Sequence, residues 1–354
     1  MSNTKTIGFG IIGSGMIAEF HAKAIKDISG CSLVAGYNPR PGKAADFCGK
    51  HGGTGYDDLN AFLADKNMDI VVIATPSGLH LEGAAAAAKA GKHVIIEKPL
   101  EITAARCDAI IAAAKANNVK VATIFQSRYH AVAGIVKKAI DEGRLGKIVL
   151  ADAQIKWYRS QEYYDSGKWR GTWDLDGGGA LMNQGIHAID LLQWFMGGVN
   201  EVFAYTDTLA HERIEVEDVG AAVLKFANGA IGVIQGTTGA YPGFFKKVEI
   251  CGTKGCVTLE EENLTTWKFA EERPEDEDIR KKFGSSTQTG GGAADPKAIG
   301  YHGHKMLFEA FVNAVREDKP LDIDGCEGRK SVEIIEAIYR SAKGHKPVTL
   351  PLKD

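Results

Sequence analysis

A histidine and two polar neighbours share one face of a helix predicted in the middle of the chain. Asn183, His187 and Asp190 are separated by four and three residues, a spacing that places them on one side of an α-helix. The ordinary pKa of histidine suits it to take a proton from a hydroxyl group near neutral pH. We therefore expect His187 to be a general base, with Asn183 and Asp190 beside it in the catalytic group. A histidine satisfied inside the core is the open alternative.

Lys98 occurs in the sequence Glu97-Lys98-Pro99, directly after an apolar strand predicted for residues 93–96. Open α/β sheets form their ligand sites at the carboxyl ends of the strands. An ammonium group there can donate hydrogen bonds to a substrate oxygen and stabilise an alkoxide before hydride departs. We expect Lys98 to be this catalytic electrophile and to contact both substrate and cofactor. The plainer alternative is a surface lysine before a proline.

A glycine-rich turn near the N-terminus has the spacing of a dinucleotide-binding loop. The run from Gly13 to Ala18 has the pattern G-x-G-x-x-A, follows an apolar strand and opens a helix. The first glycine permits the tight turn, the second lets a pyrophosphate approach the backbone, and the alanine keeps helix and strand close. The N-terminus of the helix then faces the phosphates. We expect the cofactor to contact Gly13, Ser14, Gly15, Met16 and Ile17, against the alternative of a turn needed only for packing.

The choice between NAD(H) and NADP(H) depends on the end of the second predicted strand. An acidic residue about 20 positions after the glycines commonly binds the adenosine ribose. Asn38 stands at that position here, with Arg40 just beyond it. A neutral Asn38 does not repel a 2′-phosphate and Arg40 can bind one, so the sequence favours NADP(H) over NAD(H). An Asn-Pro turn beside a solvated Arg40 is the open alternative.

Aromatic and arginine side chains gather where the second half of the chain begins. Aromatic faces and planar guanidinium groups suit a polyhydroxylated ring and any carboxylate on it. We expect substrate contacts from Asn183, His187 and this group, although ordinary packing and surface charge explain its members about as well: Arg128, Tyr129, Trp157, Arg159, Trp169 and Arg170. Residues 271–296 are polar enough to predict a mobile surface loop. His302 and His304 follow it and are expected to close over the site.

The composition excludes several functional classes. The chain of 354 residues is 44% hydrophobic and 25% charged with a net charge of −3, so it indicates a globular protein with small-molecule partners and no nucleic acid or membrane surface. No apolar run approaches the roughly 20 residues that cross a bilayer, and we expect a cytoplasmic location. The six cysteines form no C-x-x-C pair and indicate reduced, mostly buried thiols. Zinc would need more histidine or cysteine ligands than the His187 helix offers, so no metal is expected.

The predicted elements change character along the chain. Short β-rich runs alternate with helices up to about residue 125, which predicts a parallel sheet of βαβ units. Strand-like runs dominate from residue 147, with hairpin signals at Asn228-Gly229 and Lys254-Gly255, and predict a mainly antiparallel sheet. We therefore expect an α/β protein with a dinucleotide-binding domain at 1–126 and a substrate-binding domain at 127–354. The final helices are expected to pack back on the first domain.

Taken in order, the motifs resemble those of the Gfo/Idh/MocA oxidoreductase family over nearly the whole chain. The resemblance is carried by Ala74-Thr75-Pro76, His80, the run from Ala90 to Val94, Glu97-Lys98-Pro99, the segment from Gly177 to Asp190, and Gly252-Thr253-Lys254-Gly255. It implies a Rossmann domain followed by an α+β domain with a large open sheet that also serves oligomerisation into a homodimer or homotetramer, and a cis peptide between Lys98 and Pro99. It adds further cofactor contacts at Thr75, Pro76, Ser77, His80, Glu97 and Gln126.

The resemblance also implies an activity and contains one departure. Lys98 and His187 correspond to the catalytic pair, but an aspartate usually stands four residues before the histidine, where this chain has Asn183. An asparagine can hold a substrate hydroxyl but cannot share its proton, so the proton relay would end on His187. We expect an NAD(P)-dependent dehydrogenase acting on a secondary alcohol of a sugar, sugar acid, cyclitol or nucleotide sugar, with C3 of a hexopyranoside as one candidate. A cofactor-binding regulator without turnover and a glycosidase-type enzyme with transient oxidation are the alternatives.

Overall fold

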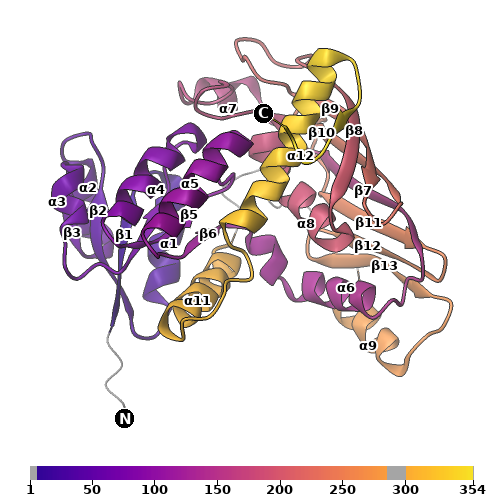
Figure 1. Ribbon diagram of the computed structural model, residues 1–354, viewed down its shortest axis with the longest axis horizontal. Coiled ribbons are helices and arrows are strands. Elements are labelled where there is room, and N and C mark those ends of the chain that lie inside the picture. The colour runs from indigo at the N-terminus through magenta and orange to yellow at the C-terminus, as the bar shows by residue number, and fades with distance from the viewer. Residues whose placement is uncertain (1–5, 285–299, 354) are drawn as a thin grey trace. The chain divides into compact units, whose positions relative to one another are not determined.

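A computed structural model describes residues 6–284 and 300–353 of the protein. The chain divides into two compact units (Figure 1). The first joins residues 1–126 to residues 300–329, and the second joins residues 127–299 to residues 330–354. The two expected domains, at 1–126 and 127–354, are consecutive in the chain. In the structure, residues 300–329 belong instead to the first unit. Within the described residues, no helix has both the length and the apolar composition to cross a membrane.

The first unit contains a six-stranded parallel sheet with strand order β3-β2-β1-β4-β5-β6. Apolar runs that are buried on both faces, such as those of β1 and β4, are typical of parallel strands covered by helices on each side. This order is the doubly wound order of dinucleotide-binding domains, which confirms the expected Rossmann fold. The strands are β1 (Ile7–Ile12), β2 (Cys31–Tyr37), β3 (Thr54–Tyr56), β4 (Ile70–Ile73), β5 (His93–Ile96) and β6 (Val121–Thr123).

Helices connect and cover these strands. They are α1 (Met16–Lys26), α2 (Lys43–His51), α3 (Leu59–Leu63), α4 (His80–Lys89) and α5 (Ala104–Ala116), with α11 (His302–Arg316) added from the distant segment. Helix α1 packs against α11, and α4 packs against α5 (Figure 1). The segment 300–329 therefore lies against the helix that opens at the glycine-rich turn. It also contains the start of α12 (Gly325–Gly344), which continues into the second unit.

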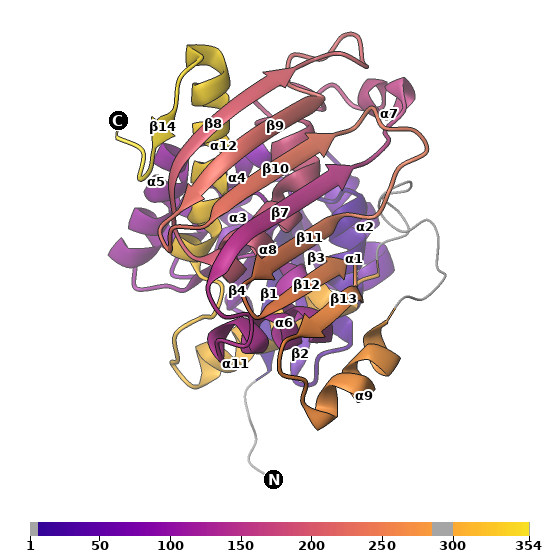
Figure 2. The same cartoon turned by 90° about the vertical axis from the view of Figure 1, so that its right-hand side faces the viewer.

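The second unit contains an eight-stranded sheet with strand order β13-β12-β11-β7-β10-β9-β8-β14 (Figure 2). Only β7 and β10 pair in parallel and the other neighbours are antiparallel, which confirms the expected mainly antiparallel sheet. The strands are β7 (Ile148–Lys156), β8 (Val199–Asp207), β9 (Val219–Phe226), β10 (Ile231–Thr237), β11 (Lys247–Gly252), β12 (Gly255–Glu260), β13 (Asn263–Phe269) and β14 (Val348–Thr349).

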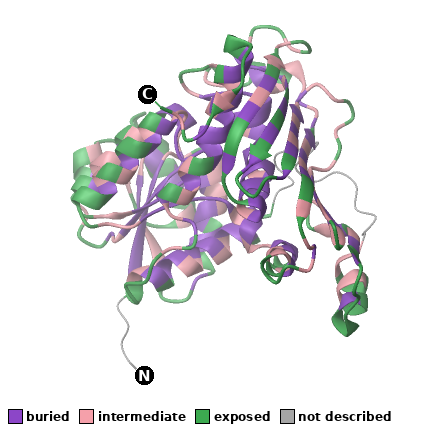
Figure 3. Ribbon diagram, turned by 45° about the vertical axis from the view of Figure 1, so that its right-hand side comes forward, coloured by how far each residue is buried: buried purple, intermediate pink, exposed green. Residues whose placement is uncertain are grey.

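One face of this sheet is covered and the other is open. Helix α8 (Ile186–Met196) packs on β7 and β11, and the residues of β9 alternate strictly between buried and not buried (Figure 3). The open face carries exposed apolar side chains, among them Tyr205, Val223 and Ile231. The remaining helices of the unit are α6 (Ala131–Asp141), α7 (Gln161–Asp165) and α9 (Pro274–Phe283).

Two expectations, one about the polar loop and one about the cysteines, were wrong in part. Helix α9 forms inside the predicted loop because acidic residues fill its first turn, basic residues fill its last, and the buried Asp276 pairs with Arg144 at 2.6 Å. Residues 285–296 of that loop lie outside the described residues. The six thiols are free as expected, but only Cys48 and Cys107 are buried, whereas Cys326 is exposed.

The triple glycine before α8 is explained by a close approach to the buried Glu217. The carboxylate of Glu217 accepts hydrogen bonds from the N–H groups of Gly179 and Leu181 at 3.0 and 2.8 Å, and from the Tyr339 hydroxyl at 2.9 Å. A Cβ on Gly179 would lie 2.0 Å from the Glu217 carbonyl oxygen, and one on Gly178 would lie 2.1 Å from the Tyr339 hydroxyl. Glycine is therefore required at both positions, and Glu217 fixes the π-helical turn Ala180–Gly185 that precedes α8.

Protonation of Glu217 predicts a pH-dependent stability. Burial raises the pKa of Glu217 from 4.5 to about 7, so its contribution to stability is complete below pH 4.5 and is lost as the pH rises through 7. The full loss amounts to about 3 kcal/mol. We therefore expect the thermal midpoint of the wild type to fall relative to that of Glu217→Gln as the pH rises from 5 to 8. Calorimetry of both proteins across this range measures the difference. A difference that is constant across that range would contradict the assignment.

Candidate active site

The glycine-rich turn between β1 and α1 leaves an open approach to the backbone. Gly13 has φ +100° and its Cβ would lie 2.6 Å from the Ala74 carbonyl oxygen, so only glycine fits. A Cβ on Gly15, in contrast, would meet no atom of the described residues within 4 Å. Helix α1 also lacks a side-chain cap at its first residue. Free backbone N–H groups at an uncovered helix N-terminus are what a pyrophosphate group requires.

Asn38 lies against this turn. Its Nδ2 donates a hydrogen bond to Ser14 Oγ at 2.8 Å, and its Oδ1 accepts one from the backbone N–H of Arg40 at 3.0 Å. Asn38 is half-buried, and Arg40 is exposed. The structure thus brings the second-strand residue to the glycines as the motif predicts.

Two buried polar atoms near the ends of β4 and β6 lack partners. Thr75 Oγ1 and Gln126 Oε1 make no hydrogen bond within the part of the chain that the structure describes. Because a buried polar atom without a partner is costly, both are suited to receive donors or acceptors of a bound dinucleotide. Together with the open Gly15 backbone, they fit the nicotinamide cofactor that the fold implies.

His80 has a different place from the one expected. It is 1% exposed, and its ring lies between backbone carbonyl oxygens, with Nδ1 2.9 Å from that of Pro99 and Nε2 3.1 Å from that of Thr75. His80 therefore connects the chain after β4 to the chain after β5. It is a positioning residue for these segments, and its expected contact with the cofactor stays a prediction.

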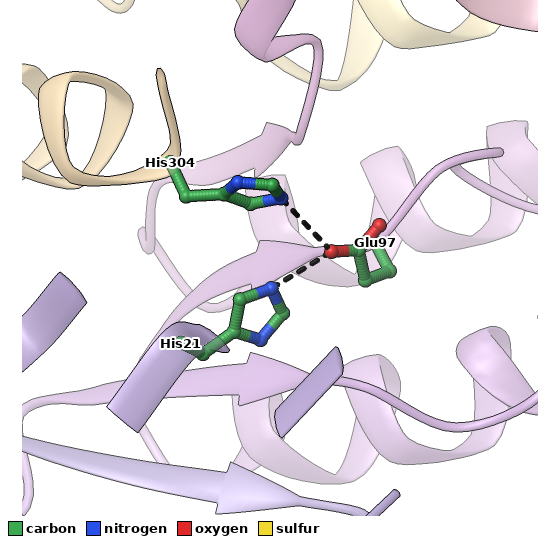
Figure 4. Close-up of side chains that lie close together, drawn as sticks. All are labelled: His21, Glu97 and His304. Atoms are coloured by element: carbon green, nitrogen blue, oxygen red, sulfur yellow. Dashed lines mark hydrogen bonds and ion pairs between the residues drawn. The ribbon is translucent and has the colours of Figure 1, made fainter. Parts of the chain in front are cut away.

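Lys98 follows β5 and is half-buried. The cis peptide between Lys98 and Pro99 is confirmed. The carboxylate of Glu97 accepts the backbone N–H of Lys98 through Oε2 at 3.1 Å. Its Oε1 lies 2.7 Å from His21 Nε2 and 3.7 Å from His304 Nε2 (Figure 4).

The group formed by His21, Glu97 and His304 corrects one expectation. His304 was expected to close over the site, but it is 2% exposed and points to Glu97 inside the first unit (Figure 4). His302 is exposed at the start of the same helix. His21 was not predicted, although it shares a helical face with the buried apolar residues Ala18, Ala22 and Ile25. A histidine on an apolar helix stripe is the signal that marks it.

The donor atoms of these three residues lie within 4.8 Å of one another and are of types that bind zinc. A metal-bound histidine usually donates its second ring N–H to an acceptor. Nδ1 of His21 and Nδ1 of His304 are both buried without a hydrogen-bond partner among the described residues. Metal binding through Nε2 would thus bury two N–H groups without acceptors, so the geometry favours a hydrogen-bonded group over a metal centre.

Asn183 and His187 are partly exposed in an otherwise buried helical segment of the second unit. From residue 180 to residue 193, these two side chains alone are not fully buried. The first lies in the π-helical turn and the second in α8. Both side chains thus lie on one partly exposed face, and π-helical turns frequently mark functional sites.

Asp190 does not belong to that face. It is 0% exposed, and its two carboxylate oxygens lie 2.8 and 2.6 Å from the guanidinium of Arg128, which is also buried. Ser331 donates to the same carboxylate at 3.2 Å. The ion pair stabilises the core of the unit, and this corrects the expected roles of Asp190 in catalysis and Arg128 in substrate binding. Neither residue's spacing reveals that they pair.

The predicted aromatic and arginine group assembles around Tyr163, which the sequence analysis missed. The guanidinium groups of Arg159 and Arg170 lie 5.5 and 4.2 Å from the Tyr163 ring centroid, and Arg170 donates to the Tyr163 hydroxyl at 2.6 Å. Arg159 also lies 5.0 Å from the Trp157 ring, and Arg170 lies 4.5 Å from the Trp169 ring. Two cations thus face the same ring. Tyr129, in the turn Gln126–Tyr129, is half-buried.

A hydrogen-bonded chain links this arginine group to Asn183. Arg159 Nε donates to Gln184 Oε1 at 3.1 Å, and Gln184 Nε2 donates to Asn183 Oδ1 at 2.6 Å. Asn183 in turn donates to the carboxylate of Asp176, which also accepts the N–H of Gly171 at 2.9 Å. The chain orients the Asn183 amide. Asp176 and Gln184 were not predicted, because nothing in the local pattern separates them from surface residues.

Comparison with known proteins agrees with the geometry. Residues 7–125 match the oxidoreductase family with an NAD-binding Rossmann fold, and residues 135–258 match the GFO/IDH/MocA C-terminal domain. The chain is 30% identical to the myo-inositol 2-dehydrogenase of Thermotoga maritima over 75% of this chain and 78% of that protein. It is 27% identical to the levoglucosan dehydrogenase of Pseudarthrobacter phenanthrenivorans over 98% of this chain and 99% of that protein.

A crystal structure of the WlbA dehydrogenase from Bordetella pertussis, in complex with NADH and UDP-GlcNAcA, is also similar. It superposes with a TM-score of 0.89 and 36% identity, and the match covers 99% of both chains. Both halves of this chain are thus matched by one family, and full-length relatives are oxidoreductases with the same two-part organisation. The chain therefore belongs to the Gfo/Idh/MocA family of oxidoreductases.

Proposed function

We propose that this oxidoreductase transfers a hydride from a secondary alcohol of a nucleotide-linked uronic acid to NAD+. The observation that carries the proposal is the placement of Arg159 and Arg170 around Tyr163, connected through Gln184 to Asn183. Two guanidinium groups suit a sugar carboxylate, because charge-assisted pairs with carboxylates are strong and directional. The WlbA dehydrogenase, which is similar over its full length, has been crystallised with such a nucleotide sugar acid.

The catalytic roles follow from the chemistry of each side chain. His187, half-exposed beside Asn183, accepts the hydroxyl proton as a general base. Lys98 donates hydrogen bonds to a substrate oxygen and stabilises its developing negative charge. Asn183 binds a neighbouring hydroxyl with its amide oriented by Asp176. The bound nicotinamide supplies the hydride acceptor.

The cofactor proposal differs from the preference expected from sequence. Arg40 favours NADP(H), whereas the similar WlbA structure holds NADH, and Asn38 uses both ends of its amide within the protein. We therefore propose NAD(H). A homo-oligomer, implied by the family resemblance, remains a prediction.

The reaction is tested by following the absorbance of reduced nicotinamide with UDP-linked uronic acids, free uronates, neutral hexoses, levoglucosan and inositols. Only the nucleotide-linked acids are expected to give rapid turnover, and NMR of the product then identifies the oxidised carbon, with C3 expected. Turnover confined to neutral sugars or inositols would contradict the substrate class while leaving the enzyme class intact.

Replacing the catalytic side chains separates chemistry from binding. We expect Lys98→Ala to lower kcat roughly 100- to 1,000-fold and His187→Ala to lower it roughly 100- to 10,000-fold. The affinity for NADH, measured by fluorescence, should be retained because the phosphates bind at the glycine-rich turn. Turnover that survives either substitution would show that the assigned residue is wrong.

Removing one guanidinium group tests substrate recognition. We expect Arg170→Met to raise KM for the uronic acid roughly 10- to 100-fold, the value of a hydrogen bond to a charged group. The effect on a neutral analogue should be small. Arg213→Met is the matched control, because Arg213 forms an exposed ion pair with Asp165 in the same unit. An equal loss for charged and neutral substrates would indicate a packing role for Arg170.

A substitution beyond β2 tests the cofactor proposal. If NAD(H) is the cofactor, NADH binds more tightly than NADPH to the wild type, and Arg40→Ala changes the dissociation constant of NADH little. Titration of both nucleotides by fluorescence measures the two constants. Tighter binding of NADPH that is lost in Arg40→Ala would instead support the preference for NADP(H) that the sequence favours.

A further inference from the structure

We propose that His21 and His304 are positioning residues for Lys98, acting as neutral imidazoles that hold the Glu97 carboxylate, which in turn fixes the Lys98 backbone. This inference rests on the proposed function only in giving Lys98 its catalytic role. It assigns a task to two buried histidines that have no other role in the proposed reaction.

The group joins three separate elements of the first unit. His21 comes from α1, Glu97 follows β5, and His304 comes from α11 (Figure 4). Their exposed fractions are 0%, 7% and 2%. Both histidines face Oε1 of Glu97, which leaves Oε2 to accept the N–H of Lys98 at 3.1 Å. The carboxylate therefore has each oxygen committed, one to the histidines and one to the lysine backbone.

The protonation states follow from the surroundings of each ring. A proton on Nδ1 of either histidine would have no acceptor among the described residues, so the ring proton belongs on Nε2, where it points to Glu97. Burial lowers the pKa of His21 despite the opposing effect of Glu97. Burial alone would raise the pKa of Glu97, but the hydrogen bond from His21 at 2.7 Å and the nearby His304 hold it well below its usual value. A carboxylate held by neutral donors results.

Aromatic packing fixes the two rings. The His21 ring lies 5.5 Å from the His304 ring and 5.4 Å from the Phe308 ring, and Phe308 stacks on Phe9 of β1 at 5.9 Å. Helix α11 thus brings both His304 and Phe308 against the sheet. Geometric support of this kind around a catalytic residue matters because small displacements of a reacting group cost rate.

Matched substitutions test the proposal. Glutamine can present an amide N–H near the position of Nε2, whereas leucine keeps the bulk and removes the donor. We expect His304→Leu to lower kcat by up to roughly 100-fold, the cost of misplacing a reacting group by about 1 Å. KM and the NADH dissociation constant should change little. His304→Gln should retain most of kcat. The variants His21→Leu and His21→Gln should show the same contrast.

Two controls distinguish positioning from mere stability. His51→Leu removes another histidine of the first unit, which pairs with Glu19, and should leave kcat unchanged. Thermal midpoints are measured for all variants. The proposal is overturned if the leucine and glutamine variants lose kcat alike, or if both lose stability while kcat is retained. It is also overturned if protein incubated with zinc and then desalted retains one metal ion per chain that His304→Leu abolishes.

A readout without any sugar separates this inference from the proposed function. Lysines methylated with 13C give NMR signals, and the Lys98 signal is the one missing in Lys98→Arg. We expect this signal to shift in His304→Leu and to stay near its wild-type position in His304→Gln. An unshifted Lys98 signal in the leucine variant would sink the inference even if the enzyme oxidises its substrate. Absence of turnover with a shifted signal would count only against the proposed function.

Discussion

Ionised carboxylates buried away from water organise this protein. A buried carboxylate is tolerated only when donors surround it, and two of those found here draw donors from elements that are distant in the sequence. Glu97 joins α1 and α11 to the end of β5. Asp276 joins α9 to Arg144, which precedes β7, and to Trp267 of β13. These groups fix the segments on which the catalytic and binding residues lie.

The same constraint explains which residues the sequence could predict. The glycine-rich turn, Lys98 after β5 and His187 on its helix are local patterns, and each follows from the few residues around it. Asn38 was placed correctly for the same reason, since the length of a βαβ unit brings the end of the second strand to the first turn.

The residues that were misplaced depend on partners far along the chain. Asp190 has helical spacing to His187, but its ion pair with Arg128 spans 62 residues. His304 follows a polar segment, yet it is buried because α11 packs on α1, which is more than 270 residues away in sequence. Helix α9 has no apolar stripe, and the remote Arg144 and Trp267 of β13 anchor it through Asp276. Local periodicity carries no information on such partners. It therefore predicts the helix on which a residue lies but not the role of that residue.

The π-helical turn before α8 has a consequence for how this scaffold diversifies. A π turn holds one more residue than an α turn, so removing one residue between positions 180 and 185 would convert it to α-helix without moving α8. If the deleted residue lay after Asn183, that residue would stand three rather than four positions before His187. Both spacings keep two residues on the same face of an α-helix, so the Asn183 amide would move by a fraction of a turn while His187 stayed in place. The length of this turn therefore sets the separation of the two side chains independently of the position of the histidine.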